Sequence, residues 1–153
     1  MPAHMPSVQP LVGEAISQVW FSDYAICYLE LGMLKAGREL PNGRIGTPRG
    51  EFTVFLGYDW KVQSEGVDRT RLDYHANDVE LASLVAKLEG AVIRSVELSA
   101  TDSEIKMCLS NGVNIFTVSA NGEAPSWNIR VDKQVSGYLC IKDQELVFEP
   151  SRP

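Results

Sequence analysis

Histidine and cysteine, the side chains most often used in acid–base, nucleophilic and metal chemistry, are scarce in this sequence of 153 residues. Of the two histidines, His4 belongs to an N-terminal stretch whose His4-Met5 pair is typical of a cloning junction. His75, beside Asp73 and Tyr74, is therefore the imidazole that could act as a general base or metal ligand. Because it stands alone in a polar segment, we expect an exposed side chain without a catalytic role.

The common catalytic motifs are missing from the sequence. It contains no H-E-x-x-H, C-x-x-C, G-x-S-x-G or G-x-x-x-x-G-K-[ST] pattern. Glu51 and Asp59 could form a carboxylate pair on the polar side of one predicted strand, although solvated charges are the simpler interpretation. Cys27, Cys108 and Cys140 are odd in number and lie among apolar residues, which indicates reduced packing cysteines. We therefore predict a protein that is not an enzyme, with no catalytic residue, metal or cofactor.

Positive charge is concentrated in residues 35–50, KAGRELPNGRIGTPRG. Four glycines, two prolines and an Asn-Gly pair predict a loop or a ragged hairpin there. Arg38, Arg44 and Arg49, together with glycine-flanked amides, could bind a phosphate or a carboxylate. No strand-to-helix transition follows the segment, so it does not fit a phosphate-binding loop of the P-loop type.

The three tryptophans fall into two groups by strand parity. Trp60 and Trp127 share parity with apolar neighbours, which predicts core packing. Trp20 shares parity with Gln18 and Ser22, which predicts an exposed ring on a polar face. Exposed aromatic side chains are favoured anchors in protein interfaces, so Trp20 is a candidate contact residue.

These side chains depend on strands for their positions, and the longest strand signal is residues 51–63, EFTVFLGYDWKVQ. Apolar or aromatic residues occupy one side without a break, and the other side is mostly polar. The apolar positions are Phe52, Val54, Leu56, Tyr58, Trp60 and Val62. We expect one long, half-buried strand of an antiparallel sheet, bent at Gly57, against which the other strands register.

Other strands are expected on both sides of this segment. Residues 15–22 and 25–33 predict an antiparallel hairpin that turns at Asp23-Tyr24. Later strands are expected at about 92–99, 104–109, 113–119, 127–131, 138–142 and 145–149. Turn signals at Asn111-Gly112 and Asn121-Gly122 make most of this half a predicted meander of neighbouring strands.

A single helix is expected at residues 77–89. Its apolar stripe consists of Leu81, Leu84, Val85 and Leu88. Asn77 is a favourable N-cap, Glu80 can complete a capping box, and Gly90 is suited to end the helix.

The predicted fold is α+β. We expect a mainly antiparallel, twisted sheet or partly open barrel of about eight strands with one packed helix. Residues 1–10 are expected to be cloning-derived or disordered, residues 11–149 to form one domain, and residues 150–153 to form a tail. GEAISQVWFS at 13–22 resembles GAVIRSVELS at 90–99, which suggests duplication of a three-strand unit. Chance similarity of two amphipathic strands is the alternative.

The acidic charge balance limits the classes of partner. There are 14 Lys and Arg against 20 Asp and Glu, for a net charge of -6. This balance argues against nonspecific binding to nucleic acid or to an anionic membrane, and it suits docking to a basic protein. No apolar run approaches the roughly 20 residues of a membrane-spanning helix, so we expect a soluble, cytoplasmic protein.

A family resemblance follows from the order of these motifs. The sequence has G-x-x-I-x-x-V-x-F at 13–21, G-Y-D-W at 57–60, a helix, G-x-x-I-x-x-V-x-L at 90–98, L-S-N-G at 109–112 and S-W-N-I at 126–129. This order resembles small, largely uncharacterised bacterial proteins, many of them encoded beside secreted polymorphic toxins and taken to be their immunity proteins. The resemblance spans most of residues 11–149, and it implies a cytosolic binding protein with no catalytic residue.

We therefore expect a non-enzymatic immunity protein that covers the active or binding surface of a cognate toxin. Acidic side chains and two aromatic anchors are the candidate contacts. They are Trp20, Asp23, Tyr24, Asp59, Asp102, Glu104 and Glu123. The alternatives are a module that binds a small molecule or peptide in a cavity between sheet and helix, and an enzyme that uses His75.

Overall fold

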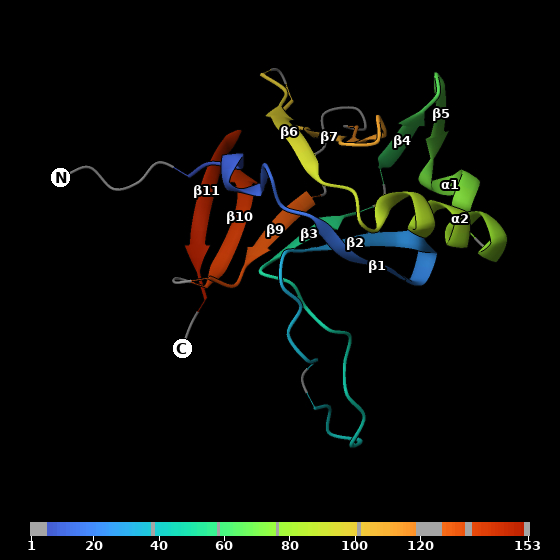
Figure 1. Cartoon of the computed structure of the whole chain (residues 1–153). Helices are drawn as coiled ribbons and strands as arrows, with labels where there is room; N and C mark the ends of the chain where they lie inside the picture. The colour runs from blue at the N-terminus through green and yellow to red at the C-terminus, as the bar shows by residue number, and fades with distance from the viewer. Residues whose placement is uncertain are drawn as a thin grey trace.

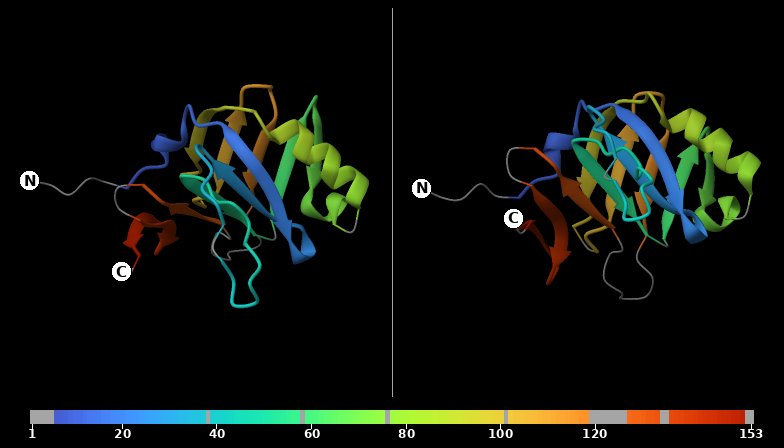
Figure 2. Two further views of the ribbon diagram at one scale, coloured as in Figure 1. Left: turned by 60° about the horizontal axis from the view of Figure 1, so that its bottom comes forward. Right: turned by 90° about the horizontal axis from the view of Figure 1, so that it is seen from below.

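Two antiparallel sheets share one hydrophobic core in the computed structural model, which describes residues 6–37, 39–57, 59–75, 77–100, 102–118, 127–133 and 136–151. Within these residues the first sheet has the strand order β1-β2-β3-β9-β10-β11, and the second has the order β5-β4-β8-β7-β6. The strands β1 and β2 of the first sheet lie across the yellow and orange strands of the second (Figures 1 and 2).

The bounds of the elements are as follows. The strands are β1 (Ile16–Ser22), β2 (Ile26–Leu31), β3 (Phe52–Leu56), β4 (Trp60–Ser64), β5 (Val67–Thr70), β6 (Ile93–Leu98), β7 (Ile105–Leu109), β8 (Asn114–Thr117), β9 (Trp127–Val131), β10 (Gly137–Lys142) and β11 (Glu145–Pro150). The helices are α1 (Arg71–Tyr74) and α2 (Asp78–Leu88), and the 3-10 turns are η1 (Gln9–Leu11) and η2 (Asp23–Ala25).

The alternating segment at 51–63 supplies the core but is not one strand. Its described apolar positions are almost completely buried, as predicted, at Phe52, Val54, Leu56, Trp60 and Val62. The prediction of a single long strand is wrong, because the chain leaves the first sheet after β3 and joins the second sheet as β4. Both sheets direct the same parity of side chains into the shared core, so the alternation continues while the backbone changes sheet.

The two halves of the chain have matching strand arrangements. β1 to β5 follow one another as β6 to β10 do, and each half places its fourth and fifth strands in the sheet of the other half. Thus β4 pairs with β8, and β9 pairs with β3. The predicted meander of neighbouring antiparallel strands is therefore correct for β6, β7 and β8 and again for β9, β10 and β11, but it is interrupted between β8 and β9, where the chain passes to the first sheet.

Equivalent hydrogen bonds recur in the two halves, one pair joining the halves and another pair lying inside them. The Gly13 amide donates to the Ile93 carbonyl at 2.8 Å, and the Gly90 amide donates to the Ile16 carbonyl at 2.8 Å. The Trp60 indole N–H donates to the Ala25 carbonyl at 2.9 Å, and the Trp127 indole N–H donates to the Ser103 carbonyl at 3.0 Å. Gly13 and Gly90 also share left-handed backbone angles, with φ of 90° and 88°. The two halves thus use the same contacts at corresponding positions.

The connection between the halves contains the predicted helix. α2 begins after Asn77, whose side chain accepts the Glu80 amide at 3.1 Å, and its Leu84 and Leu88 are buried. The Glu80 carboxylate does not close the expected capping box, because it pairs with Arg69 instead. Gly90 adopts the left-handed conformation just beyond the helix, as expected. The short helix α1 and the strand β5 were not predicted.

Two further differences concern the count of elements and the N-terminus. The described residues form two sheets with eleven strands and no closed barrel, rather than one sheet or barrel of about eight strands.

At the N-terminus, Val8 and Leu11 are buried, and the Gln9 side-chain amide donates to the Val96 carbonyl at 3.1 Å. The packed part of the chain therefore begins before residue 11.

Candidate functional site

Exposed apolar side chains gather where the β1–β2 turn meets the two helices. α1 packs against η2, and α2 follows α1 directly, at one end of the molecule (Figures 1 and 2). Tyr24 is 63%, Leu72 69% and Val79 78% exposed. We name these exposed residues of three neighbouring elements, together with the exposed Asp23, the tip patch. Large apolar side chains in such numbers are uncommon on a surface that only contacts water.

A strained turn presents Tyr24 to solvent. Tyr24 and the next residue, Ala25, both adopt left-handed backbone angles, with φ of 63° and 56°. Such angles cost a residue with a side chain roughly 1–3 kcal/mol and persist only where surrounding contacts hold them. The contacts here are the Arg71 guanidinium, which donates to the Tyr24 carbonyl, and the Trp60 indole, which donates to the Ala25 carbonyl. Strain of this kind is frequent at binding sites.

His75 lies beside the tip patch and supports the Tyr24 ring. The two rings are stacked with centroids 5.8 Å apart and an interplanar angle of 17°. His75 is exposed, as predicted. Among the described residues it has no hydrogen bond to a carboxylate or to a hydroxyl nucleophile, so the arrangement resembles an aromatic contact surface more than a general-base site.

The other predicted contact residues are dispersed. Trp20 is half-buried on the outer face of the first sheet, where its ring stacks on Tyr28, so the prediction of an exposed anchor is wrong. Asp59 is half-buried at the start of β4, and Asp102 is exposed between β6 and β7. Glu104 is 6% exposed, which excludes it from a surface of exposed acids. Glu123 lies outside the described residues.

The acids and the cysteines show no sign of catalytic chemistry in the described part of the chain. Glu51 contacts Lys133 at 3.3 Å, and no contact joins it to Asp59 among the described residues. Burial raises the pKa of the Cys27 thiol well above its ordinary range, which makes a reactive thiolate unfavourable. No group of three or more histidine, cysteine or acidic side chains is placed to hold a metal ion within the described ranges.

The basic segment forms a projecting arm, visible in cyan in Figure 1. Isolated bridges pair Lys35 with Arg49 at its base and Glu39 with Ile45 near its end, which confirms the ragged hairpin. Arg44 lies near the end and Arg49 at the base, so the two do not converge on one anion. Arg38 lies outside the described residues. The arm also exposes the apolar side chains of Leu40 and Ile45, and Met33 and Leu34 are exposed just before its base.

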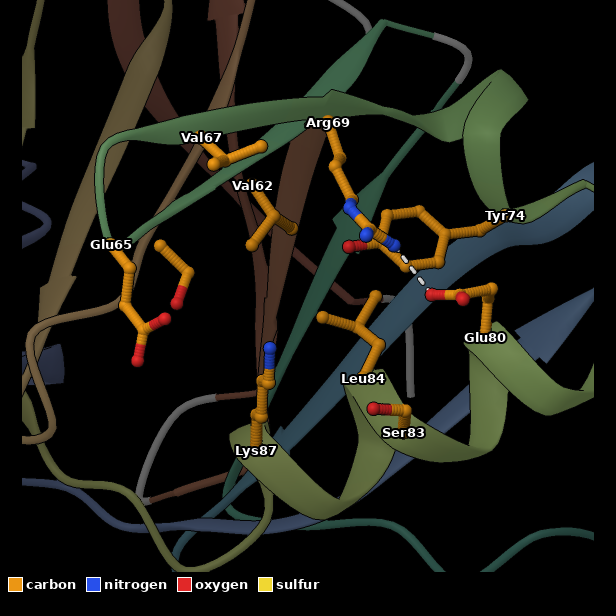
Figure 3. A pocket seen from close by; sticks show the side chains of 10 residues that line it. Val62, Glu65, Val67, Arg69, Tyr74, Glu80, Ser83, Leu84 and Lys87 are labelled. Atoms are coloured by element: carbon orange, nitrogen blue, oxygen red, sulfur yellow. Dashed lines mark hydrogen bonds and ion pairs between the residues drawn. The ribbon is translucent and has the colours of Figure 1, made fainter.

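A polar pocket of about 310 Å³ lies between the β4–β5 hairpin and α2 (Figure 3). Arg69 crosses its mouth to pair with Glu80 and lies 6.0 Å above the Tyr74 ring. Burial raises the pKa of Tyr74, although the nearby Arg69 opposes the shift. Lys87 and Glu65 line the other end. This is the cavity between sheet and helix that a ligand-binding module would use.

Comparison with known proteins gives no further guidance, since no family model, curated protein or solved structure matches the chain. The described helices include none that is long and apolar enough to cross a membrane.

Of the predicted contact residues, Asp23 and Tyr24 thus lie in one exposed patch, and sequence reasoning missed its other members, Leu72 and Val79. The sequence carried a signal for Val79, because this residue precedes α2's buried stripe and lies outside it. Leu72 carried no comparable signal, because α1 is too short to show a periodic pattern.

Proposed function

We propose that this chain is a non-enzymatic immunity protein that binds a bacterial toxin through the tip patch and covers the toxin's active or binding surface in the cytoplasm. The observation that carries the proposal is the gathering of exposed apolar side chains around Asp23 and Tyr24. The Tyr24 ring is already restrained by stacking on His75, so it loses little conformational freedom on binding. This favours Tyr24 as an interface anchor.

Charge supports a basic partner surface. The chain has a net charge of -6, and Asp23, Asp73 and Asp78 are exposed in or beside the tip patch. Opposite charge around an apolar centre speeds encounter and disfavours wrong partners. A toxin that acts on an anionic substrate would carry such a basic surface, and its occlusion would prevent substrate from binding.

The matching contacts of the two halves support a further proposal about origin. We infer that the chain is an internal duplication, and that the duplicated unit contains five strands rather than three. The equivalent indole hydrogen bonds of Trp60 and Trp127 support this, because they join corresponding strands to corresponding turns. The tip patch then belongs to one copy: the equivalent turn of the other copy, near Ser103, has no neighbouring helix among the described residues.

The alternative function is binding of a small molecule or peptide in the pocket of Figure 3. Its volume of about 310 Å³ is at the lower end of the range for ligand sites. The Arg69–Glu80 pair that crosses this pocket engages two of its four charged side chains with each other, which leaves Lys87 and Glu65 for a ligand.

The test is growth rescue in bacteria that express a toxin domain, which the proposal predicts to be encoded beside this gene. Tyr24→Asn removes the ring while keeping a residue that tolerates the left-handed turn. Combined with Val79→Ser, it should abolish rescue and weaken toxin binding by at least roughly tenfold, the effect expected of an interface anchor. Met33→Ala, which removes an equally exposed apolar side chain just before the arm, is the matched control and should rescue fully.

Two further variants separate the competing explanations. His75→Phe keeps a ring against Tyr24 and removes the imidazole, so rescue should persist if no proton transfer is involved. Replacing residues 38–45 by Asn-Gly shortens the arm across the close approach of Gly37 and Gly46. If the shortened protein fails to rescue growth while the Tyr24→Asn, Val79→Ser variant rescues fully, the docking surface is the arm and not the tip patch.

A further inference from the structure

A second site lies on the outer face of the first sheet, away from the core. Its pocket of about 250 Å³ is walled by four aromatic side chains and two arginines. They are Trp20, Tyr28, Phe55, Tyr138, Arg49 and Arg130. Side chains on the solvent face of a two-layer β protein are usually polar and separate, so a walled pocket there is unusual.

The aromatic wall is held rigidly by cross-strand contacts. Trp20 and Tyr28 are directly opposite in the β1–β2 register, and their rings stack in parallel at 3.8 Å. Phe55 is opposite Tyr28 on β3 and meets its ring edge-on at 5.4 Å. A flat ligand ring can therefore bind against surfaces that are already ordered, which lowers the entropic cost of binding.

A buried carboxylate fixes the floor of this face. Glu30 is fully buried and accepts hydrogen bonds from the Trp20 indole at 2.7 Å, from the Gly50 amide at 3.0 Å and from the Thr53 hydroxyl. Gly50 is required at the base of the arm because a Cβ there would lie 2.3 Å from the Leu31 carbonyl oxygen. These bonds position Trp20 and bring the adjacent Arg49 to the pocket.

Arg130 supplies hydrogen-bond donors that the protein leaves unused. It follows Glu30 and Thr53 across the sheet in register, and its side chain is 17% exposed. Its Nη1 lies 3.9 Å from an Asp132 oxygen, beyond hydrogen-bond distance. Its Nε and Nη2 are buried and have no hydrogen-bond partner within the described residues. Buried donors are rarely left in this state unless a ligand or water meets them.

We propose that this pocket binds a small monoanionic carboxylate attached to one flat ring. The Nε and Nη2 edge of a guanidinium matches both oxygens of a carboxylate, which gives a bidentate contact. Arg49 and Arg130, with Lys35 beside Asp132, supply three positive charges against the two negative charges of Glu30 and Asp132, so one positive charge is in excess, which suits a monoanion. The aromatic walls accept the ring, and the small volume limits the ligand to about this size. The proposal does not depend on toxin binding.

The test uses the full chain, labelled with ¹⁵N, and benzoate as the probe. We expect saturable shifts of the Trp20 indole signal and of the amides of Phe55 and Arg130. Benzyl alcohol keeps the ring without the charge, acetate keeps the charge without the ring, and inorganic phosphate is an anion of another shape. All three should bind at least roughly tenfold more weakly than benzoate, since each loses the charged bidentate bond or the ring contact.

Variants identify the group responsible. Arg130→Lys keeps the charge but loses the planar pair of donors, so benzoate affinity should fall by roughly tenfold or more. Arg94→Lys, on the exposed face of the other sheet, is the control and should bind benzoate normally. Tyr24→Asn in the tip patch should also leave benzoate binding unchanged.

Three results would overturn the proposal. Equal shifts with phosphate and benzoate would indicate a general anion site without preference for a ring. Unchanged affinity in Arg130→Lys would exclude the bidentate contact. Absence of shifts with benzoate up to its solubility limit, in a protein whose spectrum shows the native fold, would exclude the site.

Discussion

The outer faces of the two sheets differ although their backbones correspond. On the first sheet, Trp20 lies opposite Tyr28, and the two rings stack. At the corresponding place on the second sheet, Glu97 lies opposite Lys106, and both side chains are exposed. Equivalent strand pairing therefore produces an aromatic wall on one face and an ordinary solvated charge pair on the other.

The next row of cross-strand side chains on each outer face shows the same contrast. Glu30 on β2 is fully buried and pairs across the sheet with Thr53, whereas its counterpart on β7 is Cys108, which pairs with Asn114. Buried charge is costly unless it is well hydrogen-bonded, so a fold rarely retains it without a use. The first sheet's outer face thus carries a buried, hydrogen-bonded carboxylate that the shared strand arrangement does not require.

The largest expected effect tests whether the two halves pack equivalently into the shared core. Trp60→Ala and Trp127→Ala should each reduce the free energy of unfolding by about 3–5 kcal/mol, because both indoles are buried and donate to a turn carbonyl. Chemical denaturation measures both losses. A wild-type midpoint for either variant would show that the halves do not share their packing.

The second effect tests the contrast between the outer faces. Glu30→Ala should lower the free energy of unfolding by roughly 2–4 kcal/mol, since each buried donor left without an acceptor costs about 1–3 kcal/mol. The matched variant Glu97→Ala removes an exposed carboxylate and should change stability by no more than about 0.5 kcal/mol. Equal losses in the two variants would remove the distinction between the faces.

A smaller effect concerns the helix that joins the halves. Asn77→Ala should cost about 0.5–2 kcal/mol, because Asn77 accepts the Glu80 amide at the helix N-terminus. Ser83→Ala, in the exposed middle of α2, is the control and should be neutral or slightly stabilising. A midpoint and slope unchanged by Asn77→Ala would show that this cap does not stabilise the fold.

The smallest effect concerns β11, which has no counterpart in the second sheet. Lys142, and then Cys140, lower the pKa of the exposed Glu149 carboxyl. The ionised Glu149 carboxylate therefore stabilises the folded protein at pH values above the ordinary pKa of a glutamate. This stabilisation is lost as the pH falls through the lowered pKa of Glu149. Lys142→Met should return the Glu149 pKa toward its ordinary value in an NMR titration, with little change in stability at neutral pH. An unchanged Glu149 pKa in Lys142→Met would exclude an interaction between Lys142 and Glu149.

The fold could be predicted in its local parts but not in its connections. Side-chain parity identified the buried faces of Phe52 and Trp60, and the capping residue Asn77 identified the start of α2. The predicted bend at Gly57 falls where the chain crosses from β3 to β4, but the change of sheet was not foreseen, because both strands direct the same parity into one core. Sequence patterns record burial, not the sheet to which a strand belongs.

The candidate sites show a similar limit. The turn at Asp23-Tyr24 was predicted because strand signals flank it. Trp20 was assigned to the outer face correctly but to the wrong environment, because its burial depends on Tyr28 and on Glu30, residues of another strand. Glu104, which was predicted to be an exposed contact residue, is buried, and its local sequence contains no signal for this burial.

Hydrogen exchange of the complex tests the proposed docking surface most directly. The toxin domain that the proposal predicts would be added to the full chain, and amide exchange would be compared at two equivalent turns. We predict slower exchange on binding at residues 23–25 and 71–75, with no change at residues 102–105. Slower exchange confined to 102–105, or to the arm at 35–49, would contradict the tip patch as the binding surface.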